Sequence, residues 1–291
     1  MSPRNLTPPW ALLRTMQGFS SSFLVFFYQV AFGGLLALSA TPFHELDRAF
    51  YKSTGGVLFV IALFGLWGKS HLYWQNISSH VGTLPALEIL LQLTFVFCFA
   101  CYMFSLWSEH PRFRARSFAL SILTGLGGLF ASAQGFLAAP VLSVETIIYS
   151  ISFLCSSLLL GSVTVGMLIG HWYLIDTGQS LDPFMRVYKF FVIALIVQGL
   201  SVLIALPALY FLGSVPSVAA IERLWVNHST LLISRILVGQ LAPLILSWMI
   251  WRTLIIPHTM AATGLFYIAL LGVFVGEILG RQMLALTSLP F

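Results

Sequence analysis

Eight apolar runs, each long enough to cross a lipid bilayer, make up most of this 291-residue chain. A bilayer core is about 30 Å thick, and about 20 apolar residues span it as an α-helix. The chain is therefore expected to fold as an all-α, polytopic helical bundle in a membrane. Residues 1–18 would form an N-terminal tail and 19–291 a single domain. The expected spans are residues 19–40, 51–68, 84–107, 116–138, 145–175, 187–213, 228–252 and 263–288.

Composition excludes a soluble domain, because 58% of the residues are hydrophobic and only 8% are charged, whereas soluble domains carry about 25% charged residues. The net charge of +5 does not indicate nucleic-acid binding. The basic residues lie mostly in short connections, where they set orientation and contact membrane lipids. The connections after the odd-numbered spans hold eight Lys and Arg residues, against four on the other side. This bias predicts that both termini lie outside the cytoplasm.

Four charged residues lie within the apolar runs at least four residues from either end: Glu88, Arg235, Glu277 and Arg281. A charge within lipid is costly, so each is a candidate for a functional site. At 1.5 Å rise per residue, all four lie roughly 6 to 16 Å from the outer ends of their helices. We therefore expect one site near the outer face. Glu277 and Arg281 are four residues apart on one helix and can pair directly, so a purely structural ion pair is the competing interpretation.

Acids, bases and imidazoles that gather near one membrane surface are suited to quinol oxidation. That reaction releases two protons together with two electrons, so it needs hydrogen-bonding partners for the head group and a short proton exit. His71 and His80 lie in the connection that leads to Glu88, and histidine titrates near neutral pH. We expect His71, His80 and Glu88 to carry the protons out.

Two other functions have sequence support. His171 lies near the cytoplasmic end of the fifth span and could ligate a haem b, provided that a second ligand lies at matching depth; a packed or interfacial histidine is the competing interpretation. Intramembrane charges, with Pro207 and Pro243 inside helices, are also found in secondary transporters, although no internal repeat is visible. Cys98 and Cys101 form a CxxC pattern on an apolar helix, which favours inert thiols over a redox or metal pair.

Several stretches resemble those of a known protein family. The most specific is 276–281, Gly-Glu-Ile-Leu-Gly-Arg, in the last span. His71-Leu72 follows the second span and precedes Glu88, and the first span carries Gln29 ahead of a glycine pair. These features resemble the membrane-anchor subunits of dimethyl-sulfoxide reductase-type molybdoenzymes, within the wider polysulfide-reductase anchor group. The number of spans and the overall size are also similar.

The resemblance implies an anchor subunit in the inner (cytoplasmic) membrane of a bacterium or archaeon. Such subunits hold no cofactor of their own and exchange electrons with menaquinone or ubiquinone. Their redox partner is a ferredoxin-like iron–sulfur subunit, which connects to a molybdopterin catalytic subunit. By the same resemblance, His71 would be the quinol-site histidine, and Glu277 and Arg281 the terminal motif.

The chain departs from the family pattern in several places: the loop that leads to Glu88 is shorter, and residues 170–173 have no counterpart in the family. The Gly-x-Pro that usually follows the His-Leu pair is replaced by Tyr-Trp-Gln at 73–75. The aromatic pair usual after the terminal motif is replaced by Gln-Met-Leu at 282–284. The terminal substrate and the exact partners therefore stay open.

Overall fold

The computed structural model describes residues 9–75, 83–137, 143–176 and 178–291. Every helix expected from the sequence is present, and eight of the described helical segments are long and apolar enough to cross a membrane. The chain is an all-α bundle and a multi-pass membrane protein. The helices are α1 (Pro9–Leu38), α2 (Arg48–Gln75), α3 (Thr83–Ser105), α4 (Pro111–Gln134), α5 (Val144–Ile175), α6 (Asp182–Leu212), α7 (Val215–Asn227), α8 (Ser229–Ile236), the π-helical segment η1 (Leu237–Leu241), α9 (Ala242–Ile255) and α10 (Thr259–Thr287).

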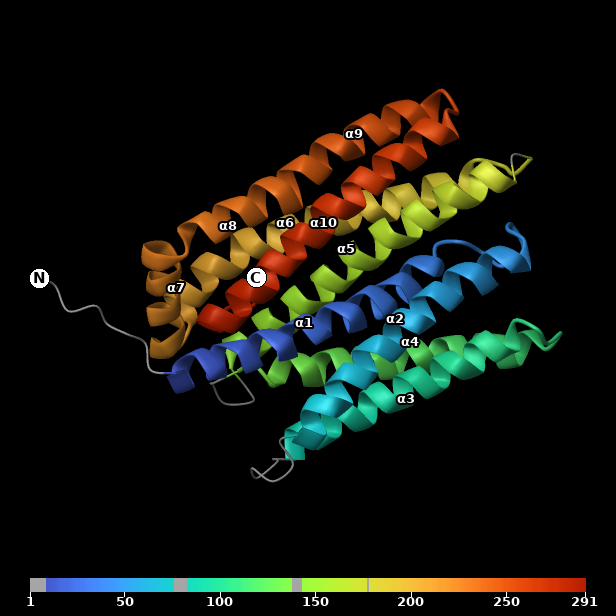
Figure 1. Ribbon diagram of the computed structural model, residues 1–291. Coiled ribbons are helices and arrows are strands. Elements are labelled where there is room, and N and C mark those ends of the chain that lie inside the picture. Colours follow the sequence, from blue (N-terminus) through green and yellow to red (C-terminus); the bar gives the residue numbers. More distant parts are fainter. Residues whose placement is uncertain (1–8, 76–82, 138–142, 177) are drawn as a thin grey trace, which may run out of the picture.

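The bundle has two lateral groups of helices joined by α1 and α5 (Figure 1). Helices α2, α3 and α4 pack on one side, and α6, α9 and α10 pack on the other. The buried surface of α5 is rich in small residues, including Ser156, Ser157 and Gly161, which lets neighbouring helices approach closely. Helices α1 and α5 therefore form the centre on which both groups rest.

The closest approach between α1 and α5 is at Gly33 and Gly161. A Cβ atom on Gly161 would overlap the carbonyl carbon of Gly33, and one on Gly33 would overlap the carbonyl oxygen of Ser157. The missing side chains allow the two backbones to touch, as small residues do at helix crossings in membranes. This contact fixes the depth of α1 relative to α5.

Replacing Gly161 by alanine is expected to lower the free energy of unfolding by about 3 kcal/mol, the upper end for overpacking, because the backbone of α1 must move. Chemical unfolding of the detergent-solubilised protein measures the change. Gly264→Ala is the matched control, because a Cβ there meets nothing within 4 Å. Equal stability of the two variants would contradict the close helix contact.

The second span is longer than the sequence predicts. The expected span ended at residue 68, but α2 continues to Gln75. Its last turns contain Lys69 and also His71, which was expected to lie in the outer connection. The extension has a physical cause, since residues 69–75 include no glycine or proline and can continue a helix. Lys69 is thus carried on a helix that packs against α1 and α3.

The seventh span is built from α8, η1 and α9, which follow one another without a break. The π-helical segment η1 ends two residues before Pro243, which lies in the first turn of α9, the part of a helix that tolerates proline. π-Helical turns are uncommon and often mark functional sites. Here Gly239 of η1 faces Gly276 of α10, and a Cβ atom on Gly239 would lie 2.7 Å from the Cα atom of Gly276.

Candidate functional site: two buried charge networks

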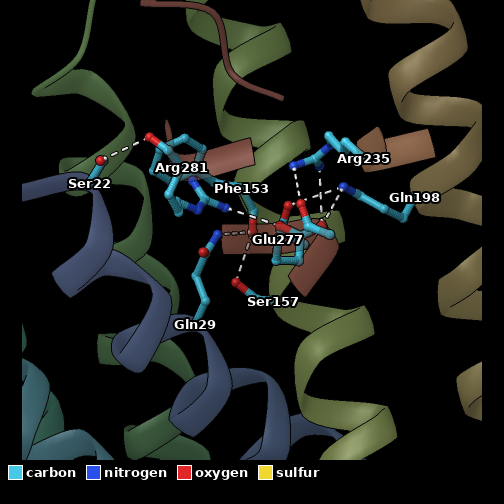
Figure 2. A network of polar contacts seen from close by, with 10 residues as sticks. Ser22, Gln29, Phe153, Ser157, Gln198, Arg235, Glu277 and Arg281 are labelled. Atoms are coloured by element: carbon cyan, nitrogen blue, oxygen red, sulfur yellow. Dashed lines mark hydrogen bonds and ion pairs between the residues drawn. The ribbon is translucent and has the colours of Figure 1, made fainter. Parts of the chain in front are cut away.

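Glu277 is the centre of a buried network that joins three helices (Figure 2). Its Oε1 lies 3.2 Å from Nη2 of Arg235 on α8, and its Oε2 lies 3.4 Å from Nη2 of Arg281 on α10. Gln198 of α6 donates through Nε2 to the same Oε1 at 3.2 Å. The side chains of the three charged residues are only 2–3% exposed. The structure therefore brings together three of the four intramembrane charges predicted to form one site.

Glycines make room for this network. A Cβ atom on Gly280 would overlap Nη1 of Arg235, so the guanidinium group occupies the space that a side chain there would fill. Arg235 also donates from Nη1 to the carbonyl oxygen of Gly276 at 3.3 Å. In the 276–281 stretch of α10, Gly276 thus lies against η1, and Gly280, four residues later, lies against Arg235. The glutamate and arginine of this stretch then pair along the same helix.

The network carries more positive than negative charge. Two guanidinium groups surround one carboxylate, and Arg281 also lies over the ring of Phe153, with 4.8 Å between its Cζ and the ring centroid. Burying charge in this way costs several kcal/mol per ion unless partners compensate. Such a surplus is better tolerated when a polar or anionic group binds beside it.

Four buried polar atoms around this network have no hydrogen-bond partner within the described residues. Two are donors, the Nε–H groups of Arg235 and Arg281, and two are acceptors, the Oε1 atoms of Gln29 and Gln198. Gln29 reaches the region from α1, where its Nε2 donates to the carbonyl oxygen of Phe153 at 2.9 Å (Figure 2). Unpaired buried polar groups are rare and costly in native proteins. Donors and acceptors are therefore both available to a small polar ligand or to water.

A second network surrounds Glu88 at the start of α3. Its Oε1 lies 2.9 Å from Nζ of Lys69 on α2 and accepts from the hydroxyl of Ser132 on α4 at 2.6 Å. Gln92, one turn along α3, donates to the same oxygen at 3.3 Å. The side chains of Lys69 and Glu88 are 13% and 7% exposed, so this pair is slightly more open than the Glu277 network. Oε2 of Glu88 is 4.0 Å from the Cβ position of Gly135, an exposed residue just after α4.

The two networks lie on either side of α1, at the same end of the bundle (Figure 1). Consecutive serines of α1 contact them separately. Lys69 donates to the hydroxyl of Ser21 at 3.1 Å, and Ser22 donates to the carbonyl oxygen of Arg281 at 3.0 Å. Glu88 therefore does not pair with Arg235 or Arg281, as a single site would require, but with a cation of its own.

The described histidines are all exposed or half-buried. His71 lies in the last turn but one of α2, where its Nε2 is 2.9 Å from Nε2 of Gln75, and its side chain is exposed. His171, the haem-ligand candidate, is also exposed on α5. His80 lies outside the described residues. The histidines of the described part are thus at the periphery, whereas carboxylate, guanidinium and amide groups occupy the interior.

Sequence reasoning missed Lys69, Gln92 and Gln198 as site residues. Gln92 and Gln198 interrupt otherwise apolar runs, and Gln92 is four residues after Glu88, so both carried a usable signal. Lys69 was missed because the expected second span ended at residue 68, one residue before it, whereas α2 continues to Gln75.

A cavity of about 240 Å³ lies at the same end of the bundle, between α5, α7 and the end of α10. It is lined by Glu145, Tyr149 and Thr287 among others, and by Phe136, whose ring lies 5.9 Å from that of Phe153. Phe153 is the ring under Arg281. One pair of aromatic rings therefore separates this cavity from the Glu277 network.

Fold and site together define a multi-pass helical membrane protein with two buried charge networks near one membrane face. No protein-family model, curated protein or solved structure matches this chain.

Proposed function

We propose that this chain is the quinone-interacting membrane subunit of an oxidoreductase in the cytoplasmic membrane of a bacterium or archaeon. The observation that carries the proposal is the Glu277 network, with its surplus positive charge and its unpaired donors and acceptors. A quinone presents two carbonyl acceptors, and a quinol presents two hydroxyl donors. The Nε–H groups of the arginines match the first, and the amide oxygens of Gln29 and Gln198 match the second.

In this proposal Glu277 is a positioning residue. Its two oxygens hold both guanidinium groups and the amide of Gln198, which leaves the Nε–H groups of the arginines available to the head group. Fixed donors of this kind stabilise negative charge on the quinone oxygens as electrons move.

Oxidation of the quinol breaks two O–H bonds and releases two electrons and two protons. The electrons pass to a ferredoxin-like iron–sulfur subunit and from there to a molybdopterin catalytic subunit, as the family resemblance implies. Glu88 is suited to the proton exit, because its Oε2 lies beside an exposed residue at the end of α4. His71 is exposed two residues beyond Lys69, and in this proposal it passes the protons to the surface.

Two measurements test the proposal. Gentle purification from the native membrane, followed by mass spectrometry, is expected to recover an iron–sulfur subunit and a molybdopterin subunit with this chain. Adding a short-chain quinol to that complex is expected to reduce its iron–sulfur clusters, which is followed by absorbance. Recovery of the chain without a redox partner would contradict the proposed assembly with an iron–sulfur and a molybdopterin subunit. Recovery of a redox complex whose clusters are not reduced by quinol would contradict the proposed quinone site.

A further inference from the structure

A cavity of about 340 Å³ lies at the opposite end of the bundle, where α1 ends and α4 begins. Leu38 and Phe118 line its apolar part, and Thr41 and Arg114 line its polar part. Phe43 completes the wall between them. Among the described residues that line the cavity there is no carboxylate, so Arg114 gives it a positive charge.

Arg114 is held in place but not fully paired. Its Nη2 donates to the carbonyl oxygen of Ser108 at 2.9 Å, and its guanidinium lies over the ring of Phe43, 5.1 Å from the centroid. Its Nε is buried and has no hydrogen-bond partner within the described residues. The nearby Glu109 pairs with Arg48 instead, at 3.6 Å. The arginine thus has a fixed orientation and a donor to spare.

The position of this cavity at the start of α4 also favours an anion. The first turn of α4, with Pro111 and Ala115, forms part of the wall, and the N-cap residue His110 makes no side-chain capping bond. The N-terminus of a helix carries a partial positive charge. Behind the wall, Tyr102 is fully buried, packs against Phe43 and Phe118, and its hydroxyl has no partner in the described structure.

This end of the bundle is also the basic one. Arg48, Lys52, Arg112 and Arg116 lie at the same ends of α2 and α4 as the cavity. Lys52 lies over the ring of Trp107, 4.9 Å from its centroid, and tryptophan is typical of the head-group level of a membrane. A cavity at that depth with an apolar wall and a fixed cation has the chemistry of a lipid site.

We propose that this cavity binds an anionic phospholipid. Its phosphate would accept a hydrogen bond from Nε of Arg114 beside the positive N-terminal end of α4, and an acyl chain would lie along Leu38 and Phe118. The inference does not rest on the proposed quinone function, because the cavity is at the other end of the bundle. It implies that the acidic lipid binds between α1 and α4 and holds these two helices together.

The test compares wild type with Arg114→Gln, and uses Arg112→Gln as a control with the same loss of charge at an exposed position of the same helix turn. Each purified protein is placed in lipid nanodiscs of pure phosphatidylcholine or with added phosphatidylglycerol, and bound lipid is counted by native mass spectrometry. We expect wild type and Arg112→Gln to retain phosphatidylglycerol. Arg114→Gln is expected to bind it about tenfold more weakly, as the loss of one charge-assisted hydrogen bond predicts.

If Arg114→Gln and Arg112→Gln lost phosphatidylglycerol binding equally, the proposal would be overturned, because the lipid would then be held by general attraction to the basic surface. Equal retention of phosphatidylcholine by wild type would overturn the requirement for negative charge. Displacement of the lipid by millimolar inorganic phosphate would assign the cavity to soluble phosphate instead. Arg114→Lys covers the case in which the glutamine variant does not fold, because it keeps the charge and removes the Nε donor; wild-type binding by that variant would also contradict the proposal.

Discussion

Glu277→Gln is expected to lower the free energy of unfolding by about 3 to 5 kcal/mol, the usual cost of removing one partner from a buried ion pair. The substitution leaves the guanidinium groups of Arg235 and Arg281 buried without a counter-charge. Both side chains are 2% exposed, so water cannot replace the carboxylate. Chemical unfolding in detergent, followed by circular dichroism, measures the change.

Because the network has more positive than negative charge, removing one arginine is the control for removing the glutamate. Arg235→Met leaves one carboxylate facing one guanidinium, so it should cost less than Glu277→Gln. The double variant leaves a single unpaired guanidinium and should fall between the two. The expected order of stability is therefore wild type, Arg235→Met, the double variant and then Glu277→Gln. If Arg235→Met were the least stable of the four, the network would be held together by packing rather than by charge.

Sequence patterns predict the fold of this chain well, because each bilayer-spanning helix is encoded locally by its own apolar run. The Glu277–Arg281 pair was equally accessible, since residues four apart on a helix share a face. Arg235 could be assigned to the same site by its depth in the membrane alone. For these residues, position along the helix is enough to predict which side chains lie together.

The position of Glu88 could not be derived in the same way. Depth places a residue along the bundle axis but says nothing about which side of α1 it faces. The ion pair with Lys69 places Glu88 on the α2 side of α1. This pair could not be predicted, because hydropathy marks the end of an apolar run and not the end of the helix that continues beyond it. The rotation of a helix about its own axis is likewise not fixed by depth, and the structure shows that His71 and His171 are both exposed on their helices.

Arg281→Lys is expected to slow quinol oxidation by at least about a hundredfold, the usual effect of removing one preorganised donor from a site that stabilises developing charge. Lysine keeps the positive charge beside Glu277. It has no Nε–H, and it cannot lie flat over the ring of Phe153 as the guanidinium does. The measurement is the rate at which a short-chain quinol reduces the iron–sulfur clusters of the purified complex.

Arg252→Lys is the matched control, because Arg252 lies over the ring of Trp248 in a similar cation–π contact but at the opposite end of the bundle. Its rate should equal that of wild type. Arg235→Lys distinguishes the roles of the two guanidinium groups. If Arg281→Lys oxidised quinol slowly and Arg235→Lys did so at the wild-type rate, the head group would lie on the α1 side of Glu277. On that side, Gln29 donates to the carbonyl oxygen of Phe153. If Arg281→Lys and Arg235→Lys both oxidised quinol at the wild-type rate and unfolded as wild type does, the network would not bind the quinone. Its role would then be to hold α8 and α10 together.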